Sequence, residues 1–180
     1  KKEKFPWRLT FVKDLEATAM IRLDGFGGPG MDTEEKARDA MQQFMDASIE
    51  KINKNGTKNL VIDVRANNGG WDNQGVELFT YLLRSDTAVK YYRRKHSVTD
   101  SSAFLQYSDL SPEDLKNVKA ELLKEEDGTY TLKAEKSPTL QLQKAKPNRF
   151  GGKVYILMDE KTFSTAAEFT AAARYYKVGI

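Results

Sequence analysis

The spacing of hydrophobic and polar positions changes along the chain between a period typical of strands and one typical of helices. Short apolar segments at 8–12 and 17–23 predict two strands separated by a polar turn. Apolar residues then recur at helical spacing over 34–53, and Asp32 or Thr33 is a candidate N-cap for this helix. The chain therefore begins with two predicted strands and a long predicted helix.

The same alternation continues in the rest of the chain. The almost wholly apolar run 59–64 predicts a strand buried on both faces, and a helix is expected over about 73–83. Residues 88–92 and 154–158 predict two further strands, and an alanine-rich helix follows Ser164. Strands that alternate with helices in this way favour an α/β fold.

Residues 93–150 differ from the rest of the chain in composition. They are polar and rich in Lys and Glu, so we interpret them as a surface insertion or lid within the core and not as a second core. Ser111 and Pro112 are typical of a helix start, as N-cap and first helical residue. The segment 128–135 is expected to form an exposed strand.

Length and composition limit the kinds of protein that this chain can be. Its 180 residues, 39% hydrophobic and 31% charged, are typical of one globular domain, with or without a large insertion. The net charge of +3 comes from mixed Lys and acidic residues, which argues against a nucleic-acid partner. No apolar run approaches the roughly 18 residues of a transmembrane helix. With no Cys and one His, we expect no disulfide, no thiolate nucleophile, no metal site and no cofactor.

Two segments have the same construction, in which an apolar strand ends at a polar or glycine-rich break before a helix. They are VIDVRANNGGWDNQ and VYILMDEKTFSTAAEF. Functional groups of α/β sheets collect at such strand ends. In the first segment, Gly69 and Gly70 either form a tight turn or aim backbone N–H groups at an oxyanion.

In the second segment, Ser164 and Thr165 are hydroxyl residues at a predicted helix start. A hydroxyl in this position is normally a cap, and Thr165 with Glu168 has the spacing of a capping box. That reading leaves Ser164 just outside the helix, exposed near the positive end of the helix dipole, where an alkoxide would be stabilised. The local pattern leaves open whether Ser164 is a cap or a nucleophile.

Together the two segments resemble the signatures of the S41 peptidase family, which contains the C-terminal processing or tail-specific proteases. The first signature is D-x-R-x-N-x-G-G after an apolar strand, and here it reads DVRANNGG from Asp63 to Gly70. The second is a strand of the type G-K-V-x-V-L, a turn and T-x-S before a helix, and here it reads GKVYIL and then TFS, ending at Ser164. Besides these two segments, the resemblance covers the opening strand pair and first helix, residues 8–64, and it does not reach 93–150.

The resemblance implies a ClpP/crotonase-like fold of stacked strand-strand-helix units and a serine endopeptidase that cleaves extended or unfolded protein substrates. Ser164 would be the nucleophile, and the N–H groups of Gly69 or Gly70 and of Thr165 would form the oxyanion hole. The strand expected at 88–92 would pair with the substrate. Because the family is mostly extracytoplasmic in bacteria, we expect a periplasmic, envelope-anchored or secreted protein.

One departure from the family pattern concerns the position of the nucleophile. The family acid usually lies three residues after the nucleophile, whereas Glu168 is four after Ser164 and three after Thr165. The T-x-S start and Phe169 favour Ser164, and a primary hydroxyl is also more accessible. We therefore predict Ser164.

A second departure concerns the general base. Family processing proteases use a lysine about two dozen residues after the serine, and the sequence ends sixteen residues after it. Lys161, Lys177 and His96 do not match that position, so we expect the base beyond Ile180, the core truncated at its C-terminus, and these 180 residues inactive or nearly so. The alternative is a catalytically incomplete domain of the same fold that binds a peptide or another ligand.

Overall fold

The computed structural model describes residues 5–93, 96–97, 107, 109 and 111–179. The chain forms two compact units. The first contains the chain up to Val89 together with the segment from Gln143 onward, and the second is Lys90–Leu142. The second unit overlaps most of the polar segment 93–150, whereas residues 143–150 belong to the first unit.

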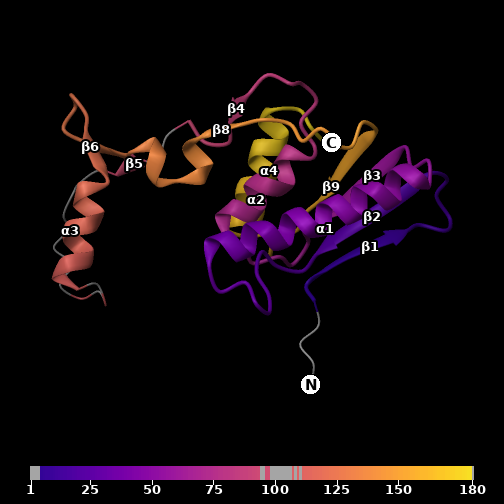
Figure 1. The fold of residues 1–180 in the computed structure, drawn as a ribbon, viewed down its shortest axis with the longest axis horizontal. Helices are drawn as coiled ribbons and strands as arrows, with labels where there is room; N and C mark the ends of the chain where they lie inside the picture. Colours follow the sequence, from indigo (N-terminus) through magenta and orange to yellow (C-terminus); the bar gives the residue numbers. More distant parts are fainter. Residues whose placement is uncertain (1–4, 94–95, 98–106, 108, 110, 180) are drawn as a thin grey trace. The chain divides into compact units, whose positions relative to one another are not determined.

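The first unit contains a four-stranded sheet, and the helix α1 (Glu34–Lys54) runs alongside it (Figure 1). The strands of the sheet are β1 (Trp7–Phe11), β2 (Thr18–Leu23), β3 (Asn59–Asp63) and β9 (Lys153–Leu157), in the order β1-β2-β3-β9. β1 is antiparallel to β2, and β2, β3 and β9 are mutually parallel. β3 and β9 therefore both point their carboxyl ends at the same edge of the sheet.

Three helices complete the first unit: α1 (Glu34–Lys54), α2 (Asp72–Thr80) and α4 (Thr165–Tyr175). α1 packs against α2, which also packs against α4. α1 begins as predicted, because the Thr33 side chain accepts a hydrogen bond from the Lys36 N–H at 3.2 Å. Its buried apolar side chains repeat at helical spacing and include Ala37, Met41, Met45, Ile49 and Ile52. The mixed α/β prediction is confirmed.

The second unit contains a three-stranded antiparallel sheet in the order β5 (His96–Ser97), β7 (Tyr130–Leu132) and β6 (Leu122–Lys124). α3 (Pro112–Ala120) precedes this sheet's β6, and two short 3-10 helices, η2 (Ala134–Lys136) and η3 (Pro138–Leu140), follow β7. The predicted cap of α3 is confirmed, since the Asp114 N–H donates to Ser111 Oγ at 3.1 Å.

Two short strands lie where the chain passes between the units, β4 (Val89–Lys90) and β8 (Leu142–Gln143). The strand predicted over 88–92 is wrong in its extent, because only two residues adopt strand geometry. A strand of two residues offers little backbone for pairing with an extended substrate. Among the described residues, no helix combines the length and apolar composition that a bilayer-spanning segment needs.

Candidate active site

The parallel pairing of β3 and β9 places the two predicted breaks side by side. Asp63 and Leu157, the last residues of the two strands, are paired in the register, so both chains leave the sheet at the same edge. The loops that follow are joined directly, because the Phe163 N–H donates to the Asn67 carbonyl oxygen at 2.9 Å. The candidate residues from 69–70 and 164–165 therefore come from neighbouring loops.

Gly69 lies directly against the turn that carries Ser164. A Cβ atom added to Gly69 would be 2.6 Å from Ser164 Cβ and 3.0 Å from both Phe163 O and Thr165 N. Gly69 also has φ +95°, a conformation that residues with a side chain rarely adopt. Glycine is therefore required at this position for the two loops to approach so closely.

Gly70 is held by a second backbone contact, with Phe26. The Phe26 N–H donates to Gly69 O at 2.8 Å, and the Trp71 N–H donates to Phe26 O at 2.8 Å. A Cβ atom on Gly70 would overlap Phe26 O, from which it would lie only 1.5 Å away. The two glycines thus have different neighbours. The Cα atom of Gly69 lies against the serine turn, and that of Gly70 lies against the Phe26 backbone.

Ser164 is the N-cap residue of α4 and has an unusual backbone conformation. Its φ of 49° and ψ of −131° are disfavoured for a residue with a Cβ atom, and its side chain makes no capping hydrogen bond. The residue is exposed. An ordinary serine cap, such as Ser111 on α3, uses its hydroxyl to accept a helix N–H. Ser164 therefore presents an exposed hydroxyl at the helix start, with no hydrogen bond to any residue that the structure describes.

The predicted capping box at Thr165 is wrong. Thr165 is the first residue of α4, and the Glu168 N–H donates to the backbone oxygen of Ser164 at 2.9 Å. The buried Thr165 hydroxyl lies 2.9 Å from Gly70 O and 3.1 Å from Asp72 Oδ1, where it can donate to one acceptor at a time. Its hydroxyl thus links α4 to the Gly70 loop and is not available as a nucleophile.

The backbone N–H groups of the site divide into engaged and free donors. The Gly69 N–H donates to Asn67 Oδ1 at 2.8 Å, so it is not free to bind an oxyanion. Within the described part of the chain, no acceptor is bonded to the N–H of Gly70 or of Thr165. Of the donors predicted for an oxyanion hole, Gly70 and Thr165 are therefore available and Gly69 is not.

Asn67 organises the loop that carries these donors. It is fully buried, and its Nδ2 donates to the Leu23 carbonyl at 3.1 Å while its Oδ1 accepts from Gly69. Its own carbonyl accepts from Phe163. Asn67 was part of the sequence motif, but no role for it followed from local pattern. The sequence feature that could have indicated its role is its place as a polar residue shortly after a buried strand.

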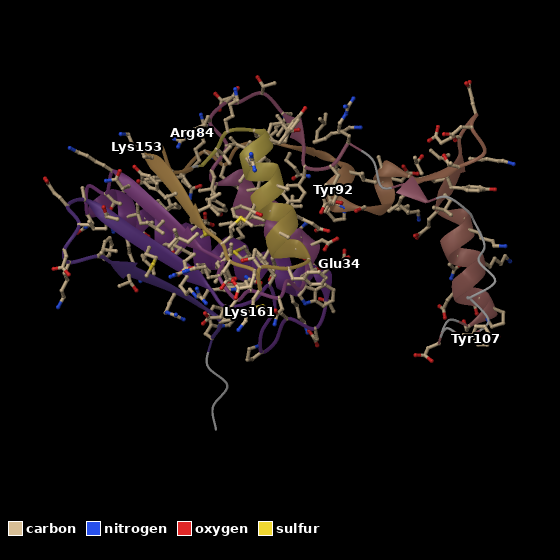
Figure 2. The ribbon with its side chains drawn as sticks, turned by 180° about the vertical axis from the view of Figure 1, so that it is seen from behind. Glu34, Arg84, Tyr92, Tyr107, Lys153 and Lys161 are labelled. Atoms are coloured by element: carbon tan, nitrogen blue, oxygen red, sulfur yellow. The ribbon has the colours of Figure 1, made fainter. Side chains whose placement is uncertain are left out.

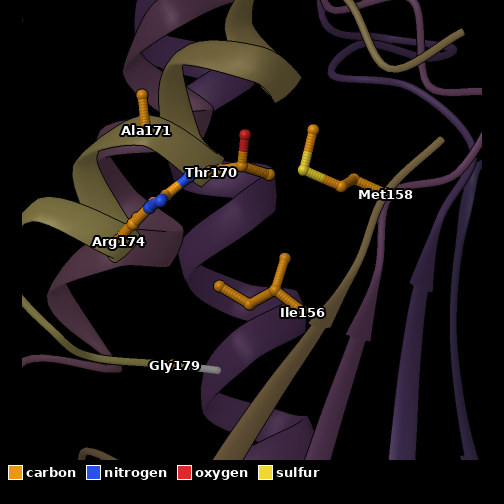
Figure 3. A pocket seen from close by; sticks show the side chains of 6 residues that line it. All are labelled: Ile156, Met158, Thr170, Ala171, Arg174 and Gly179. Carbon is orange, nitrogen blue, oxygen red and sulfur yellow. The ribbon is translucent and has the colours of Figure 1, made fainter. Parts of the chain in front are cut away.

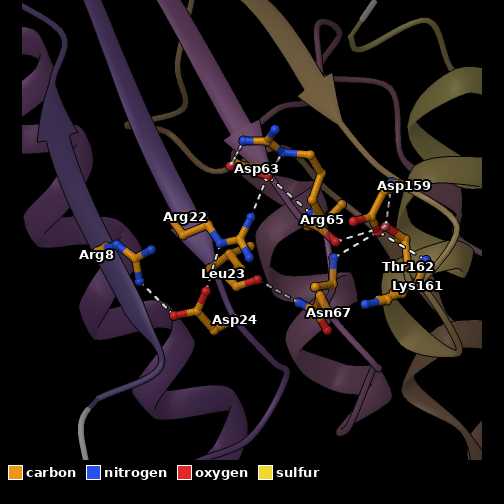
Figure 4. Close-up of polar contacts among 12 residues, drawn as sticks. Arg8, Arg22, Leu23, Asp24, Asp63, Arg65, Asn67, Asp159, Lys161 and Thr162 are labelled. Carbon is orange, nitrogen blue, oxygen red and sulfur yellow. Dashed lines mark hydrogen bonds and ion pairs between the residues drawn. The ribbon is translucent and has the colours of Figure 1, made fainter.

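Asp159 lies in the loop after β9 and binds the loop after β3 through its side chain (Figure 4). Its Oδ1 accepts the Ala66 N–H at 2.8 Å and the Lys161 N–H at 3.1 Å. The Ala66 N–H is the main cause that lowers the pKa of Asp159, so this carboxylate is ionised at neutral pH. Ala66 itself has φ 57°, which the hydrogen bond helps to hold. Sequence reasoning assigned no function to Asp159.

The buried Asp63, at the end of β3, forms an ionic cluster with Arg22 and the half-exposed Arg65 (Figure 4). Asp63 Oδ1 accepts from Arg65 Nε at 2.9 Å and from Arg22 at 2.7 Å, and Oδ2 accepts from Arg65 at 2.8 Å. The hydrogen bonds from Arg65, aided by Arg22, lower the pKa of Asp63 although burial opposes them. The cluster fixes the direction in which the chain leaves β3.

No base is bonded to Ser164 in the described part of the chain. Its Oγ forms no hydrogen bond there. Lys177 follows the eleven-residue helix α4, whose length of about 16 Å separates it from Ser164. Toward described residues, the hydrogen bond that Lys161 donates is that of its backbone N–H to Asp159 Oδ1, and His96 belongs to the second unit. Described residues form no cluster of three or more metal-binding side chains.

A cavity of about 500 Å³ lies between β9 and α4, the two elements that flank the serine turn (Figure 3). Most of its lining is apolar, and one cation faces it. The lining residues are Ile156, Met158, Thr170, Ala171, Arg174 and Gly179. A cavity of this size and chemistry can hold an apolar side chain of a bound peptide.

The sequence profile of Peptidase family S41 matches residues 17–180, so the chain belongs to this family of peptidases. No curated protein matches the chain. Among solved structures, the photosystem II D1 C-terminal processing protease is similar at 17% identity, with a TM-score of 0.48 over 98% of this chain and 35% of that one. A candidate peptidase from Parabacteroides merdae is similar at 13% identity, with a TM-score of 0.52 over 97% of this chain and 42% of that one. The chain thus spans less than half the length of either protein.

Proposed function

We propose that this chain carries the nucleophile and oxyanion hole of a serine peptidase, with Ser164 as the nucleophile. The observation that carries the proposal is the backbone of Ser164, which has φ 49° and ψ −131° and no capping bond. Such strain costs about 1–3 kcal/mol and persists where the surrounding structure requires it. A strained turn between strand and helix exposes the serine oxygen in other hydrolases. Membership of a peptidase family supports the same role.

Ser164 Oγ would attack the carbonyl carbon of a peptide bond and form a tetrahedral intermediate with a negatively charged oxygen. The hydroxyl proton passes to a base, which later protonates the departing amine. The free N–H groups of Gly70 and Thr165 are the donors for the oxyanion, and the positive end of α4 adds to the stabilisation. Asn67 and Asp159 act as positioning residues, because they hold the loops that carry these groups.

The substrate proposed is an extended or unfolded protein segment with an apolar side chain in the cavity beside α4. We further propose that the first unit belongs to the ClpP/crotonase-like group of α/β folds. The parallel strands followed by helices and the similarity to the Parabacteroides merdae structure support this assignment. An extracytoplasmic location is also proposed, by analogy with the family.

A second function, binding without catalysis, is favoured by one observation. Ser164 Oγ has no hydrogen-bonded base among the residues that the structure describes. A serine hydroxyl without a base is a weak nucleophile near neutral pH. In this alternative the same two loops would hold an extended peptide, with its carbonyl oxygen on the N–H groups of Gly70 and Thr165.

The two functions are separated by a serine-directed phosphonate probe, which forms a covalent bond with an activated serine. The 180-residue chain is incubated with the probe at several pH values, and the modified peptide is identified by mass spectrometry. We expect slow modification of Ser164 that accelerates as pH rises, because deprotonation of the hydroxyl is not assisted. Ser164→Ala should abolish the modification and leave thermal unfolding nearly unchanged.

The matched control is Ser111→Ala, which removes another serine at a helix N-cap. It should leave modification of Ser164 at the wild-type rate. Modification that persists in Ser164→Ala would refute the proposed nucleophile. If the probe does not react but an extended peptide shifts the amide resonances of Gly70 and Thr165, the binding function is favoured.

A further inference from the structure

A second concave site lies at the opposite edge of the sheet from Ser164, where β3 and β9 begin. The cavity has a volume of about 610 Å³. Most of its side chains are cationic or polar, and two glycines complete its wall. The lining residues are Lys58, Asn59, Arg84, Gly151, Gly152 and Lys153. All of them belong to the first unit.

The positive charge of this cavity is not neutralised by neighbouring acids. No Asp or Glu is among the described residues that line it. Lys58, Arg84 and Lys153 form no ion pair with any acid in the described part of the chain. Asp86, close to Arg84 in sequence, pairs at 2.6 Å with Arg149. Three cations therefore face one cavity in a chain whose net charge is only +3.

Arg84 is held in place by the backbone of the cavity wall. Its Nη1 donates to Gly152 O at 2.5 Å and to Gly151 O at 3.3 Å, while no bond to a described residue engages its Nε or Nη2. Gly152 is needed for this geometry, since a Cβ atom there would lie 2.3 Å from Lys58 O. Figure 2 shows Arg84 and Lys153 at the same end of the first unit. A guanidinium fixed in this way loses little side-chain entropy when it binds an anion.

We propose that this cavity binds a phosphate-type oxyanion that carries more than one negative charge. The planar edge of Arg84 suits two oxygens of such a group, and Lys58 and Lys153, whose backbones are joined by the Lys153 N–H to Lys58 O hydrogen bond, add two point charges to the same wall. Among the described residues that line the cavity there is no aromatic ring and no Val, Ile, Leu or Met side chain, so the charged and amide head groups are the features that favour a small anion. The phosphate group can come from a free polyphosphate or from the headgroup of an anionic phospholipid.

The test uses inorganic pyrophosphate as the probe and follows the amide resonances of Gly151, Gly152 and Lys153 by NMR at low ionic strength. Wild-type protein should show saturable shifts at these residues. Lys58→Gln with Lys153→Gln should weaken binding by about tenfold or more, because two charge-assisted contacts are lost. The matched control, Lys51→Gln with Lys119→Gln, removes the same charge from lysines that form no ion pair with described residues and should bind like wild type.

Arg84→Lys keeps the charge but removes the planar guanidinium, and it should also weaken binding while circular dichroism remains unchanged. A parallel experiment measures co-sedimentation with vesicles of phosphatidylglycerol and of phosphatidylcholine. Pyrophosphate binding alone identifies a free phosphate ligand, and selective binding to the anionic vesicles that depends on Lys58 and Lys153 identifies a lipid headgroup. Equal affinity of the charge variant and its control, or no saturable binding to either probe, would overturn the proposal.

Discussion

Substitution of Gly69 by alanine tests the proposed architecture of the active site at its tightest point. The new Cβ atom would be 2.6 Å from Ser164 Cβ and 3.0 Å from Thr165 N and Phe163 O. Ordinary carbon–carbon contacts are about 3.5–4.0 Å, so the loops must separate by roughly 1 Å. Two of the three neighbours are backbone atoms, which cannot move aside by a change of rotamer.

The expected cost has two parts. An alanine at φ +95° is strained by about 1–2 kcal/mol relative to glycine. Overpacking against neighbours that cannot rotate away adds about 1–3 kcal/mol. We therefore expect the free energy of unfolding to fall by about 3 kcal/mol. Displacement of Ser164 by about 1 Å from the oxyanion donors should slow its reaction by about a hundredfold.

Urea unfolding measures the stability of the variant, and the rate at which the phosphonate probe modifies Ser164 measures the site. The control is Gly56→Ala, because Gly56 has φ +63° and no atom within 4 Å of the added Cβ. This control should show the backbone strain alone, with a loss of about 1–2 kcal/mol and an unchanged rate of modification. The difference between the variants isolates the contact with the serine turn.

The reasoning is refuted if Gly69→Ala and Gly56→Ala lower the free energy of unfolding equally and the probe modifies Ser164 at the same rate in both variants. That result would mean that Gly69 does not press against the serine turn in solution. A slower reaction with no extra loss of stability would contradict only the overpacking estimate, because it would show that the loops separate at little cost.

Two further variants address other parts of the site. Thr165→Val should lower the free energy of unfolding by about 1–2 kcal/mol and slow modification of Ser164, because Gly70 O loses its hydroxyl donor; Thr165→Ser should restore both quantities, and failure of serine to do so would argue against the hydrogen bond. Asp63→Asn should lower the free energy of unfolding at pH 7 by about 2 kcal/mol, since the buried carboxylate binds two arginines. The lowered pKa of Asp63 means that its contribution is fully present above its unfolded pKa of about 3.9 and is lost as pH falls through the folded pKa. Urea unfolding between pH 3 and 7 should therefore show wild type and Asp63→Asn converging at the acidic end, and a constant difference would contradict the ionic role.

Several features of the first unit were predictable from the sequence, because the spacing of apolar residues reports directly which face of an element is buried. This holds for α1 with its cap at Thr33, and for β1, β2, β3 and β9. The two motif segments were also recognisable. In one a glycine pair, and in the other a hydroxyl pair, lies between an apolar strand and the helix that follows it. The extent of β4 was not predictable, because apolar residues at 88–92 do not by themselves supply a strand partner.

The roles of individual groups in the site depended on contacts between residues far apart in the sequence. The local pattern predicted Thr165 as a helix cap. In the structure its hydroxyl is within hydrogen-bonding distance of Gly70 O, which lies 95 residues away in the sequence. The local pattern also did not distinguish Gly69 from Gly70. In the structure the Asn67 side chain accepts the Gly69 N–H, and no described acceptor binds the Gly70 N–H. The strained backbone of Ser164 lies in one of the two loops that meet at this sheet edge, close to Gly69. Such contacts are set by the pairing of β3 with β9, which no periodicity within either segment encodes.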